Sequence, residues 1–78
     1  MTTTNHAFIT QHRHFLKDWK QSQVYRGLSG EVRSGFLRIM QEEFWPGYHT
    51  DLDCGVCVGE LLGRLEDKML EYEKQTKA

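Results

Sequence analysis

Proline occurs once in the 78 residues and cysteine twice, and no stretch of the chain is a long apolar run. A single proline leaves little room for irregular linkers, so we expect one domain spanning residues 1–78. Two cysteines cannot form the disulfide framework of a small secreted protein. The apolar stretches are shorter than the roughly 20 residues of a membrane-spanning helix, and the opening MTTTNH lacks the features of a signal peptide. We therefore expect a soluble, cytoplasmic protein that does not bind membranes.

The sequence also lacks the motifs of the common enzyme classes. No serine or cysteine has a histidine and an acid at a spacing that indicates a nucleophile with its base. No glycine-rich loop follows a strand-like stretch, which excludes the usual nucleotide-binding motifs. Carboxylates pair at 42–43 and at 51 and 53, where we expect them to cap helices and face solvent rather than to transfer protons. The sequence therefore predicts a protein that is not an enzyme and has no small-molecule substrate.

Helical periodicity is present in three segments, residues 5–23, 29–44 and 53–74, where apolar residues recur three and four positions apart. Asn5 and Ser29 are the expected N-caps of the first two segments. Asp51 or Asp53 is the expected N-cap of the third. The third segment also carries a heptad pattern, formed by Val58, Leu62, Leu65, Met69 and Tyr72. These features predict an all-α fold, either a small three-helix bundle or an open helical array, with the C-terminal helix the longest.

Three glycines, Gly55, Gly59 and Gly63, lie four residues apart in the third segment and so share one face of the helix. Each costs about 1 kcal/mol relative to alanine inside a helix, which predicts that another backbone or a bulky ring approaches this face closely. That neighbour is either one of the other two helices or a partner chain. The expected interaction face consists of Gly55, Val56, Gly59, Gly63 and Leu70, with Trp45 and Tyr48 from the preceding turn as aromatic anchors or as a closure of the core.

The segment from His49 to Cys57 is the richest in reactive side chains, because Cys54 and Cys57 form a C-x-x-C pair at the start of the third helix. Free cysteines usually behave as small apolar residues, so we expect both to be reduced and to pack against this helix, with no cofactor. A zinc site with His49, Cys54 and Cys57 as ligands is the alternative. Its fourth ligand would be one of Asp51, Asp53, His12 and His14. A redox pair is a third possibility, although no strand precedes the motif as in thioredoxin-like proteins.

Charge is divided unevenly along the chain, with +4 in residues 1–40 and −5 in residues 41–78. Such a chain can associate head to tail with itself or offer its basic half to an acidic partner. Alternatively, the charges serve only to keep the outer face of each helix solvated. A nucleic-acid-binding role would use Arg13, Lys17, Lys20, Arg33 and Arg38. This role ranks second, because the connector 24–28 is longer than a tight helix-turn-helix turn and the 29–44 helix exposes few base-reading groups.

Residues 47–62, which read GYHTDLDCGVCVGELL, resemble the C-terminal part of short bacteriophage and mobile-element proteins, notably those of Bacteroidetes hosts. These proteins share a GY…CxxCVxE helix after a variable helical region. The resemblance implies a phage or mobile-element origin, and it transfers no functional residue because that group has no assigned activity. The leading expectation is a protein–protein interaction module that self-associates or binds a host or virion protein. The alternatives are a nucleic-acid-binding domain, with or without a zinc staple, and a metal or redox role for the two cysteines.

Overall fold

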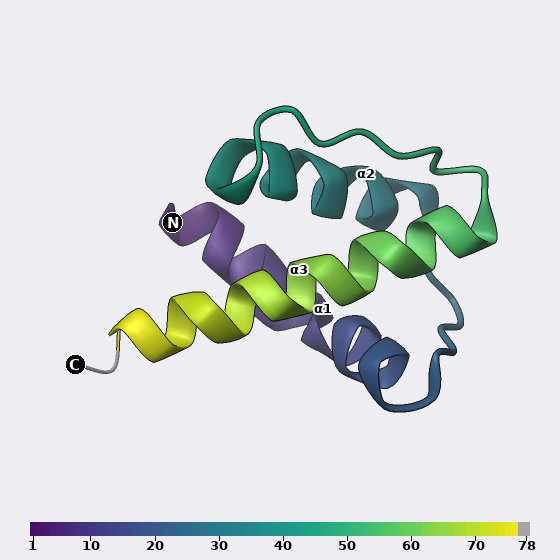
Figure 1. Ribbon diagram of the computed structural model, residues 1–78, viewed down its shortest axis with the longest axis horizontal. Helices are drawn as coiled ribbons and strands as arrows, with labels where there is room; N and C mark the ends of the chain where they lie inside the picture. The colour runs from purple at the N-terminus through teal and green to yellow at the C-terminus, as the bar shows by residue number, and fades with distance from the viewer. Residues whose placement is uncertain (77–78) are drawn as a thin grey trace.

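The computed structural model describes residues 1–76, which form three α-helices and a short π-helix. The elements are α1 (Thr3–Ser22), α2 (Gly30–Ile39), η1 (Met40–Phe44) and α3 (Gly55–Thr76). The described residues contain no strand, and α3 is the longest helix, so the predicted all-α class is confirmed. In Figure 1, α1 lies behind α3 and α2 lies beside them, while the loop after η1 runs back along α2 to the start of α3.

The first two helices begin at hydroxyl caps. The side chain of Thr2 accepts a hydrogen bond from the Asn5 N–H at 3.1 Å, so α1 begins earlier than predicted and the assignment of Asn5 as its cap is wrong. Asn5 is instead buried within the helix, where its amide donates to two carboxylates of η1. Ser29 caps α2 as predicted by accepting from the Val32 N–H at 3.3 Å. Gln23 adopts the left-handed conformation that stops α1, with φ of 56°.

The N-cap of the third helix is Cys54, and the prediction of an aspartate cap is wrong. The sulfur of Cys54 accepts a hydrogen bond from the Cys57 N–H at 3.3 Å, and its carbonyl accepts from the Val58 N–H at 2.9 Å. These are the two bonds that an N-cap residue makes. Asp51 stabilises the turn that precedes α3 instead of capping the helix. Its carboxylate accepts a hydrogen bond from the Asp53 N–H at 2.9 Å.

The end of the second helical segment is a π-helical turn. The Trp45 N–H donates to the Met40 carbonyl five residues earlier at 2.7 Å. The helix ends at Phe44, the predicted end of the second segment, because the residue before Pro46 disfavours helical geometry. The wider turn brings Glu42 and Glu43 toward the start of α1. It therefore ties the N-terminal segment to the middle of the chain.

The core lies between the three helices and includes the heptad seam of α3. Four of the five seam residues are fully buried and Tyr72 is partly buried, so the predicted seam is confirmed. The fully buried apolar side chains are Ile9, Leu16, Phe36, Ile39, Met40, Val58, Leu61, Leu62, Leu65 and Met69. Two close approaches hold the helices together, since the Phe8 ring packs on Gly35 of α2 and the Trp19 ring packs on Gly59 of α3. Within residues 1–76, no helix has the length and apolar composition needed to cross a membrane.

Ion pairs between α1 and α3 join the basic half of the chain to its acidic half. The Arg13 guanidinium donates to the carboxylates of both Glu66 and Glu73, and these hydrogen bonds raise the pKa of Arg13 above its ordinary value. The same arginine lowers the pKa of Glu73. Lys20 forms a second ion pair with Asp67, at 2.8 Å. Part of the charge asymmetry seen in the sequence is therefore neutralised inside the fold.

Candidate functional site

The surface of α3 opposite its buried seam is the main candidate site, and we call it the outer face of α3. It consists of Val56, Glu60, Gly63, Arg64, Asp67 and Leu70. Val56 is 71% exposed and Leu70 is 50% exposed, which makes them the most exposed large apolar side chains among the described residues. They lie seven residues on either side of Gly63, and this spacing aligns all three along one side of the helix. The outer face is therefore apolar at both ends and charged between them.

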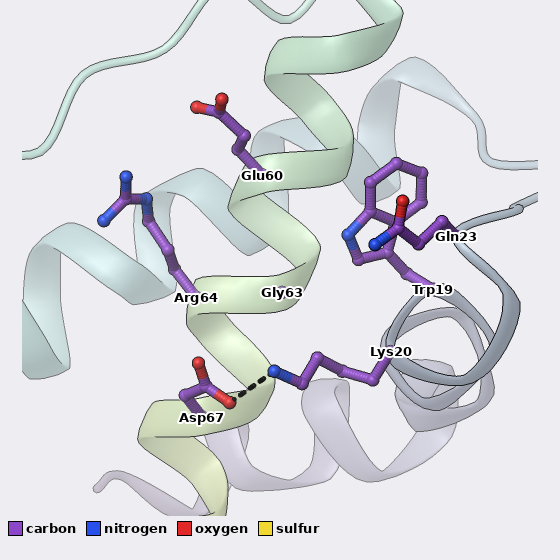
Figure 2. Close-up of a pocket in the computed structure, with 7 residues that line it drawn as sticks. All are labelled: Trp19, Lys20, Gln23, Glu60, Gly63, Arg64 and Asp67. Atoms are coloured by element: carbon purple, nitrogen blue, oxygen red, sulfur yellow. Dashed lines mark ion pairs between the residues drawn. The ribbon is translucent and has the colours of Figure 1, made fainter.

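A shallow groove of about 320 Å³ crosses the middle of this face. Figure 2 shows side chains from the end of α1 on one side of α3, and three charged side chains of α3 on the other. The lining residues are Trp19, Lys20, Gln23, Glu60, Gly63, Arg64 and Asp67. The ion pair of Lys20 with Asp67 closes one end of the groove. Neither Glu60 nor Arg64 forms an ion pair among the described residues, although the Arg64 guanidinium lies over the Trp45 ring.

The three glycines of the predicted interaction face have different surroundings. Gly59 is buried beneath the Trp19 ring, so the expectation that it belongs to an interface is wrong and the intramolecular alternative holds there. At Gly63 a Cβ atom would lie 3.3 Å from the indole nitrogen of Trp19, at the edge of the groove. Gly55 is exposed, with the Tyr25 hydroxyl as its nearest neighbour. Only Gly63 and Gly55 are therefore accessible to a partner.

The two predicted aromatic anchors also differ. Tyr48 is buried, and its carbonyl accepts a hydrogen bond from the Gln41 amide at 2.7 Å. For Tyr48 the core-closing alternative therefore holds, and its place in the interaction face is wrong. Trp45 is 43% exposed, and its ring lies 5.1 Å from the Tyr48 ring. The Arg64 guanidinium lies 5.8 Å from the centre of the Trp45 ring. Trp45 therefore extends the outer face of α3 on the side of Arg64.

The two cysteines are free and half-buried, and the Cys54 sulfur caps α3. The hydrogen bonds that Cys54 accepts from the side chain and then the backbone of Cys57 lower its pKa. The same side-chain bond, followed by burial, raises the pKa of Cys57. His49 is exposed. In the part of the chain that the structure describes, no three histidine, cysteine or acidic side chains are grouped so that they could hold a metal ion.

Four of the five basic residues assigned to the nucleic-acid alternative have partners within the chain. Arg13 and Lys20 pair with acids of α3, Arg38 donates to Asn5 and Glu42, and Arg33 donates to the Leu52 carbonyl. Lys17 is exposed. A phosphate backbone would have to compete with carboxylates for most of these cations, so the structure gives this alternative little support.

The groove and its charged rim were not anticipated from the sequence as a site. The spacing of Val56, Gly63 and Leu70 was visible in the sequence, since it repeats every seven residues opposite the seam. The sequence does not show that Trp19 lines this groove. A helical pattern indicates which face of a helix is apolar, but it does not indicate which residues of a neighbouring helix cover that face. Comparison with known proteins finds no matching family model, no matching curated protein and no matching solved structure.

Proposed function

We propose that this chain is a small, non-enzymatic protein–protein interaction module that self-associates through the outer face of α3. The observation that carries the proposal is the pair of exposed apolar residues placed symmetrically about Gly63. In an antiparallel arrangement of two α3 helices centred on Gly63, Val56 of one copy faces Leu70 of the other copy, and this contact occurs twice. Such a self-complementary patch is what a two-fold dimer requires.

The free charges support the same arrangement. Glu60 precedes the centre by three residues and Arg64 follows it by one, so an antiparallel neighbour brings them within about 3 Å of each other along the helix axis. Each copy then supplies one glutamate and one arginine to two cross-pairs. Asp67 also approaches Glu60 of the second copy, but Lys20 already neutralises its charge. The absence of a side chain at Gly63 lets the two helices come close together.

The expected affinity is modest. Full burial of a valine or leucine side chain contributes roughly 1.5–3 kcal/mol, and the four apolar side chains of this interface are already partly covered in the single chain. Ordering and the loss of translational freedom oppose association by several kcal/mol. A weak dissociation constant, on the order of 0.1–1 mM, is therefore the expectation. As part of the same proposal, the module acts in the cytoplasm.

Sedimentation equilibrium from micromolar to millimolar concentration tests the proposal. We expect a monomer–dimer equilibrium that Leu70→Glu weakens at least about tenfold, because the new carboxylate would be buried against an apolar side chain. Ala7→Glu adds the same charge at an exposed position of α1 away from the outer face, and serves as the matched control. A strict monomer at millimolar concentration, or equal weakening by both substitutions, would contradict the proposal. A monomer that binds another protein through the same face would leave interaction as the function but not self-association.

A further inference from the structure

The first turn of α3 brings two thiols together at the molecular surface. Cys54 occupies the cap position and Cys57 lies three residues later, with 3.3 Å between the Cys54 sulfur and the Cys57 backbone nitrogen. Residues three apart on a helix have Cα atoms about 5 Å apart. This separation lies within the roughly 4.4–6.8 Å that a disulfide spans. Both side chains are half-buried rather than enclosed, so a reagent in solution can reach them.

The two sulfurs are chemically distinct because of their positions in this turn. Cys54 accepts hydrogen bonds from the Cys57 side chain and from backbone N–H groups, which favour its thiolate and lower its pKa. Cys57 is a donor in the same contact, so its pKa is raised. The carboxylate of Asp51 opposes ionisation of both thiols, but its effect is smaller than that of these hydrogen bonds. Cys54 is therefore the better nucleophile of the pair.

An apolar groove begins directly after Cys54. It has a volume of about 410 Å³ and is lined by Trp19, Gln23, Val24, Tyr25, Gly55 and Val56. The Tyr25 hydroxyl donates to the Gly55 carbonyl at 3.1 Å and fixes this wall against the start of α3. Asp51 and Asp53, both exposed, lie just before the cysteines. An uncharged disulfide with apolar flanks therefore suits these surroundings better than an anionic one.

We propose that Cys54 and Cys57, apart from the interaction role, form a redox-active dithiol that reduces one equivalent of an accessible, uncharged disulfide and closes to an intramolecular disulfide, a stoichiometric reaction without turnover. The Cys54 thiolate attacks one sulfur of the substrate, forms a mixed disulfide and releases the first substrate thiolate. Cys57 then loses its proton to that thiolate or to water and attacks the Cys54 sulfur. This second step releases the other half of the substrate as a thiol. Two electrons pass from the protein to the substrate disulfide, and both thiol hydrogens of the protein end on the products or in solvent.

Mass spectrometry after reaction with 2-hydroxyethyl disulfide tests this assignment on the full chain. The wild type is expected to lose a pair of hydrogen atoms and to retain no adduct. Cys57→Ser is expected to stop at a stable mixed disulfide on Cys54. Cys54→Ser is expected to react at least about tenfold more slowly than Cys57→Ser, because the remaining Cys57 thiol lies outside the cap position, where backbone N–H groups stabilise the Cys54 thiolate. Serine is a good N-cap, so Cys54→Ser keeps the start of α3 intact, and equal helical circular dichroism of the two variants verifies this.

Three results would overturn the proposal. The first is a wild-type protein that accumulates one or two adducts without closing a disulfide. The second is a Cys54→Ser variant that reacts as fast as Cys57→Ser. The third is a native protein that carries one equivalent of zinc and becomes reactive only after chelation. Oxidised glutathione, which is anionic, is expected to react several-fold more slowly than the neutral probe, and a faster reaction would contradict the proposed preference for an uncharged disulfide.

Discussion

At the scale of single residues, the contact between Gly59 and Trp19 sets how closely α1 and α3 approach. The ring atoms of Trp19 occupy the space where any side chain at position 59 would begin. An indole is rigid, so it cannot yield at its far edge as a lysine or methionine could. The glycine therefore serves helix packing, and its unfavourable helix propensity is offset by the burial of a large aromatic side chain.

Gly59→Ala is expected to lower the melting temperature without changing the oligomeric mass. Overpacking costs roughly 1–3 kcal/mol, which exceeds the gain of about 1 kcal/mol from replacing a helical glycine. Gly55→Ala is the matched control, because its nearest neighbour, the Tyr25 hydroxyl, would be at 3.7 Å, an ordinary contact. Thermal unfolding followed by circular dichroism measures both variants. A Gly59→Ala protein as stable as the wild type would contradict the packing described here.

Arg13 is the second residue on which the fold depends. Glu66 is almost fully buried, and Arg13 provides its counter-charge. Removal of one partner from a buried ion pair leaves the other charge uncompensated, which costs roughly 3–5 kcal/mol. Arg13→Leu is therefore expected to destabilise the protein by about that amount, while Arg13→Leu with Glu66→Leu recovers most of the loss. Denaturant titration provides the two free energies of unfolding, and a double variant less stable than the single one would refute this account.

At the scale of elements, the π-helical turn η1 anchors the start of α1. The Glu43 carboxylate accepts hydrogen bonds from the Asn5 side chain at 2.8 Å and from the Thr2 N–H at 3.1 Å. These bonds, that of Asn5 above all, hold the pKa of Glu43 below its usual 4.5. A carboxyl group whose pKa is lower in the folded state stabilises the fold above its unfolded pKa. That contribution disappears as the pH falls through the folded pKa.

Acidification is therefore expected to destabilise the protein from about pH 4.5 downward, in the range where carboxylates become protonated. Glu73, whose pKa is lowered by its hydrogen bond with Arg13, adds to this loss in the same direction. Glu43→Gln is expected to be less stable than the wild type at pH 7 and to lose less stability between pH 6 and pH 3. Melting temperatures at a series of pH values measure this difference. Parallel pH profiles for the two proteins would show that Glu43 does not act as described.

The sequence predicted the positions of the three helices better than the residues that cap them. Apolar spacing predicted three helices and the buried seam of α3, because burial of one face is the dominant requirement on a short helix. The caps were harder to predict, because a capping side chain competes with other partners. Asn5 is a good N-cap by type, but two carboxylates of η1 bind its amide. Cys54 is not a usual cap, and neither it nor the π-helical turn has a distinctive sequence signal.

At the scale of the whole molecule, the uneven charge of the two halves is used largely within the chain. The sequence indicated head-to-tail association or a basic surface for an acidic partner, but α1 and α3 lie side by side and their charges pair. Charge totals cannot reveal such pairing, because it depends on which helix faces lie opposite each other. What remains accessible is the outer face of α3, whose Glu60 and Arg64 have no ion-pair partner in the described part of the chain.

The candidate site was therefore predicted only in part. Helical spacing grouped Val56, Gly63 and Leu70 on one side of α3, and in the structure Val56 and Leu70 are exposed there. It wrongly added Gly59 and Tyr48 to the interaction face. Periodicity does not show that Trp19 covers Gly59, and it does not show that the loop after η1 carries Tyr48 into the core. The groove itself arises from the end of α1 meeting α3, a long-range contact for which the local sequence contains no signal.

The most direct test of self-association through the outer face of α3 is the molecular mass of two mixed charge-reversal variants. Glu60→Arg places two arginines at each cross-pair of the dimer, and Arg64→Glu places two glutamates there. Each variant alone is therefore expected to be monomeric at concentrations where the wild type is dimeric. An equimolar mixture is expected to sediment as a heterodimer, because each cross-pair again joins opposite charges. A mixture that stays monomeric, or single variants that dimerise as strongly as the wild type, would contradict the account.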